Sequence, residues 1–105
     1  NVYIDDKIID YIVTIVAATR YPEKYGLPIK SMLSYGVSPR GSLNLFSASK
    51  AHAFLKNRHF VTPDDVKAVA YPTLRHRIIT TYEAEAQGLS SDDIITKILN
   101  AVPAP

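Results

Sequence analysis

The feature that most constrains the fold is a long apolar segment close to the N-terminus. Residues from Asp5 to about Arg20 predict a helix, because Asp5 can cap the free amides of its first turn and Arg20 suits the negative end of the helix dipole. Polar residues fall on one narrow stripe, and most of the remaining surface is covered by Ile8, Ile9, Ile12, Val13, Ile15 and Val16. A helix with this pattern is buried on more than half of its circumference. We therefore expect it to be the central member of a packed core.

Composition indicates one globular domain that needs no cofactor, disulfide or metal ion for its stability. The chain has 105 residues, of which 47% are hydrophobic and 21% are charged, as in an ordinary globular domain. The absence of cysteine excludes disulfide scaffolds, thiolate zinc sites and cysteine nucleophiles. The most apolar stretch, residues 8–18, is interrupted by Asp10 and is too short to span a bilayer. A membrane is therefore not among the expected partners.

Three further helix starts follow from capping residues. Ser38, followed by a proline, predicts the N-cap of a second helix that closes at Asn57 in the left-handed conformation. Thr62, followed by a proline and two aspartates, is the clearest start and predicts a helix that runs to Pro72, which can itself open another short turn that carries Leu74. Ser90 begins the last helix. The buried face of the second helix is expected to consist of Leu43, Leu45, Phe46, Ala48, Ala51, Ala53, Phe54 and Leu55.

A long connector over residues 21–37 separates the first two helices. Connectors of this length inside small domains tend to be functional or mobile. The β-branched run at residues 78–81 is typical of a short strand, which could pair with residues near 32–37. The predicted fold class is all-α: a small helical bundle with a minor two-stranded ribbon.

The most informative local feature is the run Gly36-Val37-Ser38-Pro39-Arg40-Gly41. An arginine in the first turn of a helix opposes the macrodipole by roughly 0.3–1 kcal/mol. A bound anion, most naturally a phosphate, would remove this conflict by taking the guanidinium of Arg40 together with the free amides of the first turn. Gly41 leaves the backbone approachable. The alternative, which spacing alone favours, is an ordinary surface arginine in a slightly poor position.

Arg75, His76 and Arg77 form a second cationic cluster. It can contact phosphate, nucleic acid or an acidic partner, or it can pair with Asp64, Asp65 or the C-terminal acids. His52 and His59 are seven residues apart without a third ligand at a suitable interval, so no metal site is expected. The paired aspartates all stand at predicted helix starts, where capping explains them.

Nucleotide-binding glycine motifs are missing from the chain. The four glycines, at positions 26, 36, 41 and 88, match neither G-x-x-x-x-G-K-[ST] nor G-x-G-x-x-G. No serine has the small-residue turn of a nucleophile elbow. The chain is therefore not expected to hold a complete active site or to be an enzyme by itself.

Four motifs occur in one order that resembles the C-terminal lid of the MoxR-type AAA+ ATPases. Each motif alone is weak, but the four together cover nearly the whole chain. They are Tyr11-Ile12-Val13 through Ala18-Thr19-Arg20, Gly36-Val37-Ser38-Pro39-Arg40, Arg58-His59-Phe60-Val61-Thr62-Pro63-Asp64-Asp65-Val66 and Leu74-Arg75-His76-Arg77-Ile78.

The resemblance implies that residues 1–105 are a single helical lid domain and that a P-loop ATPase core, absent from this chain, lies upstream. It implies that Arg40 is the sensor II residue, which reaches the γ-phosphate of ATP, with Ser38, Pro39 and Gly41 beside it. ATP, with Mg²⁺ in the missing core, is then the cofactor. The implied partners are that core, neighbouring protomers of a generally hexameric ring, and a client protein matured by chaperone-like remodelling in the bacterial cytoplasm. The role of residues 75–77 stays open.

Two departures from the family pattern are visible. Gly41 stands where alanine is commoner and could loosen the turn that aims Arg40, and Asn57 stands where glycine is commoner. Two other functions remain open beside the lid. One is a helical module that binds nucleic acid through the basic region 50–77, and the other is a plain protein-interaction bundle.

Overall fold

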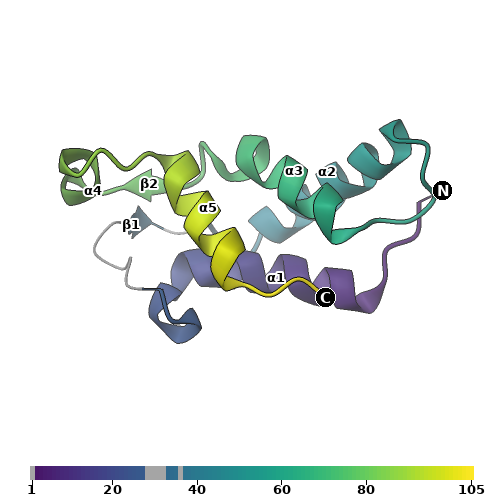
Figure 1. The fold of residues 1–105 in the computed structure, drawn as a ribbon, viewed down its shortest axis with the longest axis horizontal. Coiled ribbons are helices and arrows are strands. Elements are labelled where there is room, and N and C mark those ends of the chain that lie inside the picture. The colour runs from purple at the N-terminus through teal and green to yellow at the C-terminus, as the bar shows by residue number, and fades with distance from the viewer. Residues whose placement is uncertain (1, 28–32, 36) are drawn as a thin grey trace.

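The computed structural model describes residues 2–27, 33–35 and 37–105, and for residues 33–35 it describes the backbone. The elements are α1 (Asp6–Arg20), the 3₁₀-helix η1 (Pro22–Tyr25), β1 (Leu33–Tyr35), α2 (Gly41–Leu55), α3 (Pro63–Leu74), β2 (Ile79–Thr80), α4 (Tyr82–Ala86) and α5 (Ser91–Ala101). The molecule is elongated, with extents of 44 × 23 × 21 Å, and α4 lies at one end of its long axis (Figure 1). The predicted all-α class is confirmed.

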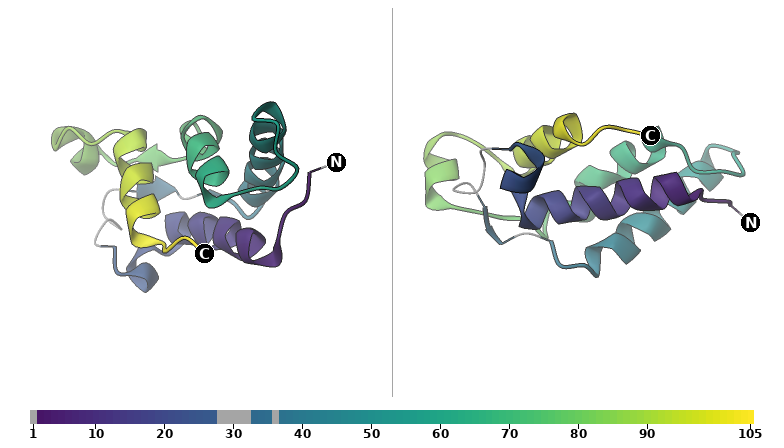
Figure 2. Two further views of the ribbon diagram at one scale, coloured as in Figure 1. Left: turned by 45° about the vertical axis from the view of Figure 1, so that its right-hand side comes forward. Right: turned by 90° about the horizontal axis from the view of Figure 1, so that it is seen from below.

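Helix α1 is the central element, as predicted. It packs against α2, α3 and α5, and the view from below in Figure 2 places it between α5 and α2. The Asp5 side chain accepts a hydrogen bond from the Lys7 amide and so caps the helix. Val13 is the exception to the predicted burial, since half of it is exposed.

Helices α2 and α3 form the most extensive helix pair, through one line of small and medium residues on α2. Gly41, Leu45, Ser49 and Ala53 repeat at intervals of four and are buried. The predicted buried face is wrong for Leu43, Ala51, Phe54 and Leu55, which are exposed. The physical reason is that α2 carries apolar residues on all sides, whereas neighbouring elements cover only one side of the helix.

Two predicted helix boundaries are wrong. The second helix begins at Gly41 instead of Ser38, with Arg40 as its N-cap residue. The third helix continues through Pro72 to Leu74. Pro72 lies on the exposed face, so it costs the helix one amide donor, while Ala70 and Leu74 are buried and hold the last turn. The predicted left-handed Asn57 is confirmed, with φ of 59°.

The predicted ribbon is confirmed: β1 pairs with β2 in antiparallel orientation, with Leu33 opposite Thr80. Residues 28–32 and 36 of the predicted connector lie outside the described residues. Two short helices, η1 and α4, were not predicted. The last helix begins with a capping box, in which Ser90 and Asp93 satisfy each other's backbone amides.

Candidate functional site

The run from Ser38 to Gly41 forms a tight turn at the entrance of α2. The Gly41 amide donates to the Ser38 carbonyl over 2.8 Å, and the Ser42 amide donates to the Pro39 carbonyl over 3.1 Å. The Leu43 amide donates to the Arg40 carbonyl in the same way. The prediction that first-turn amides are free to bind an anion is therefore wrong for Gly41, Ser42 and Leu43, because the chain tightens into a turn with hydrogen bonds between residues three apart.

A buried hydrogen bond anchors this turn to the C-terminal end of α1. Thr19 Oγ1 donates to the Val16 carbonyl over 2.7 Å and accepts the Val37 amide over 2.8 Å. Thr19 and Val37 are each 1% exposed. Because Val37 directly precedes Ser38, this contact holds the start of the turn in place. Sequence reasoning missed the role of Thr19, although the residue lies in one of the quoted motifs.

Gly41 packs against the side chain of Val37. A Cβ atom at position 41 would lie far inside van der Waals contact of Val37 Cγ1. Val37 is β-branched, buried and bonded to Thr19, so it has little freedom to move away. The glycine therefore allows the turn to sit close to the core, in place of the expected loosening.

Replacing Gly41 by alanine is expected to lower the free energy of unfolding by about 1–3 kcal/mol, because the added methyl overpacks the site. Urea unfolding of the 105-residue chain measures the change. Ser42→Ala, at the next position on the same helix, is the matched control and should change the stability by less than about 0.5 kcal/mol. Equal stability of the Gly41→Ala variant and the parent chain would contradict this packing.

The side chain of Arg40 is exposed and makes no hydrogen bond or ion pair with any described residue. Next to Pro39 lies a small hollow of about 120 Å³, which Arg20 and Tyr21 also line. The Arg20 guanidinium lies 5.6 Å from the centre of the Tyr21 ring. Arg20 is a cation near the turn that sequence reasoning treated only as a helix end. The arrangement offers an accessible guanidinium on an anchored backbone.

The cluster at residues 75–77 is divided by the fold. Arg75 forms a two-point ion pair with Asp92, with Nε–Oδ1 of 2.7 Å and Nη2–Oδ2 of 3.1 Å, which links α3 to α5. Hydrogen bonding to Asp92 raises the pKa of Arg75. The alternative in which this cluster pairs with a C-terminal acid is confirmed for Arg75. His76 and Arg77 are exposed.

Asp65 is the centre of a buried polar network that the sequence did not reveal. Arg58 donates to both carboxylate oxygens, over 2.5 Å and 2.6 Å, and His52 Nδ1 lies 2.6 Å from Oδ1. Thr62 donates through its amide and its hydroxyl. Burial by itself raises the pKa of Asp65, but the hydrogen bonds from Arg58, Thr62 and His52 together lower it well below its usual range. The carboxylate thus has a structural role, joining α2 to α3.

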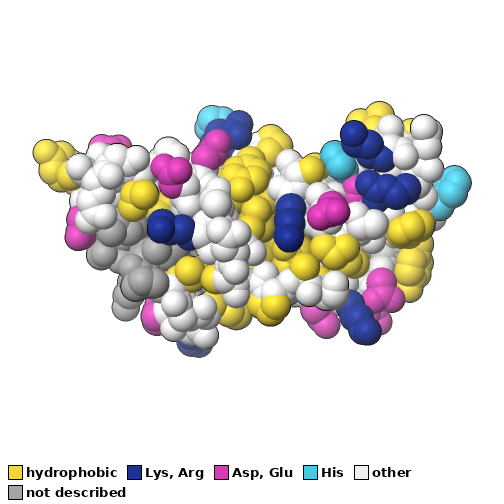
Figure 3. Space-filling model, in the orientation of Figure 1, with side chains coloured by type: hydrophobic (Ala, Val, Ile, Leu, Met, Phe, Trp, Pro, Cys, Tyr) yellow, Lys and Arg dark blue, Asp and Glu magenta, His cyan; other side chains and the backbone are white. Residues whose placement is uncertain are grey.

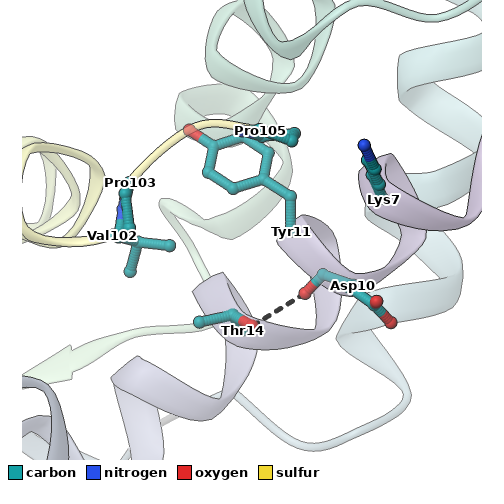
Figure 4. A pocket seen from close by; sticks show the side chains of 7 residues that line it. All are labelled: Lys7, Asp10, Tyr11, Thr14, Val102, Pro103 and Pro105. Carbon is teal, nitrogen blue, oxygen red and sulfur yellow. Dashed lines mark hydrogen bonds between the residues drawn. The ribbon is translucent and has the colours of Figure 1, made fainter.

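A second hollow, of about 270 Å³, lies where the C-terminal tail crosses α1 (Figure 4). The Tyr11 hydroxyl is buried there without a hydrogen-bond partner in the described structure, and burial raises the pKa of Tyr11. Thr14 Oγ1 donates to the Asp10 carbonyl of its own helix.

The described part of the chain contains no group of three or more His, Asp or Glu side chains that could hold a metal ion. It also contains no helix whose length and apolar character would allow it to cross a membrane.

Comparison with known proteins identifies relatives of the whole chain. The family model described as AAA lid domain matches residues 29–98. A solved structure of a candidate ATPase from Cytophaga hutchinsonii superimposes with a TM-score of 0.93 and is 47% identical. That match covers 99% of this chain and 32% of the other chain.

Curated relatives point in the same direction. Chaperone MoxR1 of Mycobacterium tuberculosis is 38% identical over 100% of this chain, and protein MoxR of Paracoccus denitrificans is 33% identical over 90% of it. Protein YeaC of Bacillus subtilis is 41% identical over 100% of this chain. The chain spans only 28% to 30% of the length of these relatives.

Proposed function

The chain belongs to the AAA lid domain family, and from this premise we propose that it is the nucleotide-sensing lid of a MoxR-type AAA+ ATPase. In this proposal Arg40 is the sensor II residue and contacts the terminal phosphate of ATP. The observation that carries the assignment is the state of Arg40: an exposed guanidinium with no hydrogen-bond or ion-pair partner among the described residues, presented by a turn that Thr19 anchors to α1.

The residues around Arg40 fit a role in contacting the terminal phosphate of a nucleotide that another domain holds. Ser38, Pro39 and Arg40 are exposed on one turn, whereas Gly41 is buried and contributes close packing. The amides of Gly41, Ser42 and Leu43 already donate to carbonyls of the turn, so in this proposal the guanidinium of Arg40 supplies the main contact to a phosphate. A single turn cannot enclose ATP, and the core domain would hold the nucleotide and its Mg²⁺.

Chemically, the proposed role is charge stabilisation. Negative charge is spread over the equatorial oxygens of the transferred phosphoryl group in the transition state. A guanidinium fixed near those oxygens stabilises this charge without reorganising at the moment of reaction. Movement of the lid relative to the core then couples hydrolysis to the remodelling or maturation of a client protein. We place this ATPase in a ring, generally hexameric, in the bacterial cytoplasm, with Arg40 at a subunit boundary.

The competing function, nucleic-acid binding through region 50–77, is less favoured by the side-chain contacts. Arg58 is bonded to Asp65, and Arg75 is bonded to Asp92. The Lys50 ammonium lies over the Phe46 ring at 5.5 Å. Three of the cations in this region are thus engaged inside the fold, and phosphate-backbone binding depends on free cations.

Hydrogen exchange in the full-length ATPase tests the proposal. We expect amides of residues 37–43 to exchange more slowly with a slowly hydrolysed ATP analogue than with ADP, because a contact between Arg40 and the γ-phosphate stabilises the turn. Arg40→Ala should abolish this difference between the two nucleotides. Equal exchange with both nucleotides in the unaltered ATPase would count against the role of Arg40.

A further inference from the structure

The stretch of sequence between Asp10 and Asp64 is basic. Glu23 is its only acidic residue. Its basic residues are, in chain order, Arg20, Lys24, Lys30, Arg40, Lys50, Lys56 and Arg58. Cations that are not balanced by carboxylates raise the local concentration of anions. Because this stretch contains both the end of α1 and the turn that presents Arg40, more than one cation can serve an anion near that turn.

The fold separates these cations into two groups. Basic side chains gather at the right-hand end of the molecule, over the end of α2 (Figure 3), and there Arg58 is bonded to Asp65. The second group lies where α1 ends and α2 begins, and it consists of Arg20, Lys24 and Arg40. All three are exposed, and none forms an ion pair with a carboxylate in the described part of the chain. The second group therefore keeps its charge available for an anion.

Arg20 is placed beside the turn of Arg40 by the same contact that anchors the turn. Thr19, the residue before Arg20, accepts the Val37 amide over 2.8 Å in a buried hydrogen bond. Arg20 also lines the hollow of about 120 Å³, together with Pro39, which directly precedes Arg40. The end of α1 and the turn are thus joined, so the two arginines stand on one anchored unit of backbone.

The Tyr21 ring restricts the side chain of Arg20. The guanidinium carbon of Arg20 lies 5.6 Å from the centre of this ring. The backbone of Tyr21 is fixed on both sides, because its amide donates to the Ala17 carbonyl over 2.9 Å and its carbonyl accepts the Lys24 amide over 3.0 Å. A cation over an aromatic face is held without using its N–H donors. Arg20 is therefore oriented and keeps its donors for a ligand.

The hollow beside Arg20 has an apolar lining, to which Val13, Val16 and Ala17 contribute. Val16 is buried, and Ala17 is half-buried. Apolar walls lower the local dielectric, so a charge at their edge interacts more strongly with an anion than it would in open water. The surroundings of Arg20 thus favour binding of a charged group at the mouth of the hollow.

We propose that Arg20 is a second cation that binds the terminal phosphate of ATP beside Arg40, with Tyr21 as its positioning residue. The inference rests on the proposed function, in which Arg40 contacts this phosphate. The transferred phosphoryl group spreads its charge over three equatorial oxygens, and a guanidinium in a two-point contact binds two of them. One oxygen then remains for Arg20. Two fixed cations on one phosphate stabilise more of its charge than Arg40 does alone.

Nucleotide affinity of the full-length ATPase tests the inference. Dissociation constants for ADP and for a slowly hydrolysed ATP analogue are measured for the unaltered protein and for Arg20→Ala. The variant should bind the triphosphate roughly tenfold more weakly and ADP with nearly unchanged affinity. Lys24→Ala is the matched control, because the Lys24 ammonium lies 4.8 Å from the same ring but outside the described lining of the hollow. It should change neither affinity.

Two substitutions of Tyr21 test the positioning. Tyr21→Phe keeps the ring and should leave both affinities unchanged. Tyr21→Leu removes the ring and should weaken binding of the triphosphate roughly threefold, with little change for ADP. A purely structural role of Arg20, as a cation at the negative end of the α1 dipole, predicts a lower melting temperature for Arg20→Ala without any change in nucleotide preference. Thermal unfolding of each variant separates the two explanations.

The inference and the proposed function can fail separately. Weaker triphosphate binding in Arg40→Ala with none in Arg20→Ala would overturn the inference and leave the role of Arg40 intact. Equal losses for ADP and the triphosphate in Arg20→Ala would also overturn it, because the contact is assigned to the terminal phosphate. No loss in either variant would overturn the inference and the proposed function together.

Discussion

Arg40→Ala in the full-length ATPase is expected to lower the turnover number by about 10²–10³-fold, the usual cost of removing one preorganised donor that stabilises transition-state charge. The lid should still fold, because the Arg40 side chain contacts no described residue through a hydrogen bond or ion pair. Steady-state ATPase assays at saturating ATP measure the effect. Arg40→Lys should recover only part of the loss, since an ammonium cannot reproduce the two-point contact of a guanidinium.

The matched control for this prediction is Arg77→Ala. Arg77 is another exposed arginine of the same domain and lies in the turn after α3. Its removal should change turnover by less than about twofold. Turnover that survives Arg40→Ala, or that falls equally in both variants, would refute a specific role for Arg40.

Asp65→Asn is expected to destabilise the domain by about 3 kcal/mol. Removing one partner of a buried ion pair costs about 3–5 kcal/mol, and the low end applies here because Arg58 and His52 are 29% and 27% exposed and can reach water. For a chain of this size the melting temperature should fall by more than about 10 °C. Calorimetry or thermal unfolding followed by circular dichroism measures the change.

Asp93→Asn is the comparison that isolates the Arg58–His52 network. Asp65 and Asp93 each close a capping box as the third residue of their helix, and Asp93 is exposed. Asp93→Asn should therefore destabilise the domain much less than Asp65→Asn, because only an exposed capping interaction is lost. Similar losses in the two variants would show that the buried network adds nothing to the cap.

The same network predicts a pH dependence of stability. Because the pKa of Asp65 is lowered in the folded state, its contribution is complete above the unfolded pKa of about 3.9 and is lost as the pH falls below that value. The parent chain should lose stability steeply between about pH 4 and pH 2, whereas Asp65→Asn should lose less. Parallel pH profiles for the two proteins would contradict the assignment.

Local signals account for the parts of the fold that were predicted. The caps at Asp5, Thr62 and Ser90 and the left-handed Asn57 act within a few residues of chain, so sequence alone reveals them. The ribbon also follows from a β-branched run and an extended connector. Pro72 predicts a helix end, because a proline removes an amide donor from a helix interior. The helix nevertheless continues to Leu74, because burial of the Leu74 side chain outweighs the loss of that hydrogen bond.

The candidate site also has a part that the sequence predicts and a part that it does not. The position of Arg40 at a helix start marks it as a candidate, and the family resemblance supplies its role. Its support was invisible in the sequence, because Thr19 and Val37 are 18 residues apart and meet only after the chain folds. The exposed face of α2 was missed for a related reason: apolar residues such as Phe54 and Leu55 suggest a core position when no neighbour is in view.

The claim that Arg40 contacts the terminal phosphate of ATP is tested most directly by measuring the affinity of the ATPase for nucleotides. Dissociation constants for ADP and for a slowly hydrolysed ATP analogue are measured for the full-length ATPase and its Arg40→Ala variant. A charge-assisted contact to the γ-phosphate predicts that the variant binds the triphosphate roughly 10- to 100-fold more weakly and binds ADP with nearly unchanged affinity. An equal loss for both nucleotides, or no loss for either, would contradict the claim.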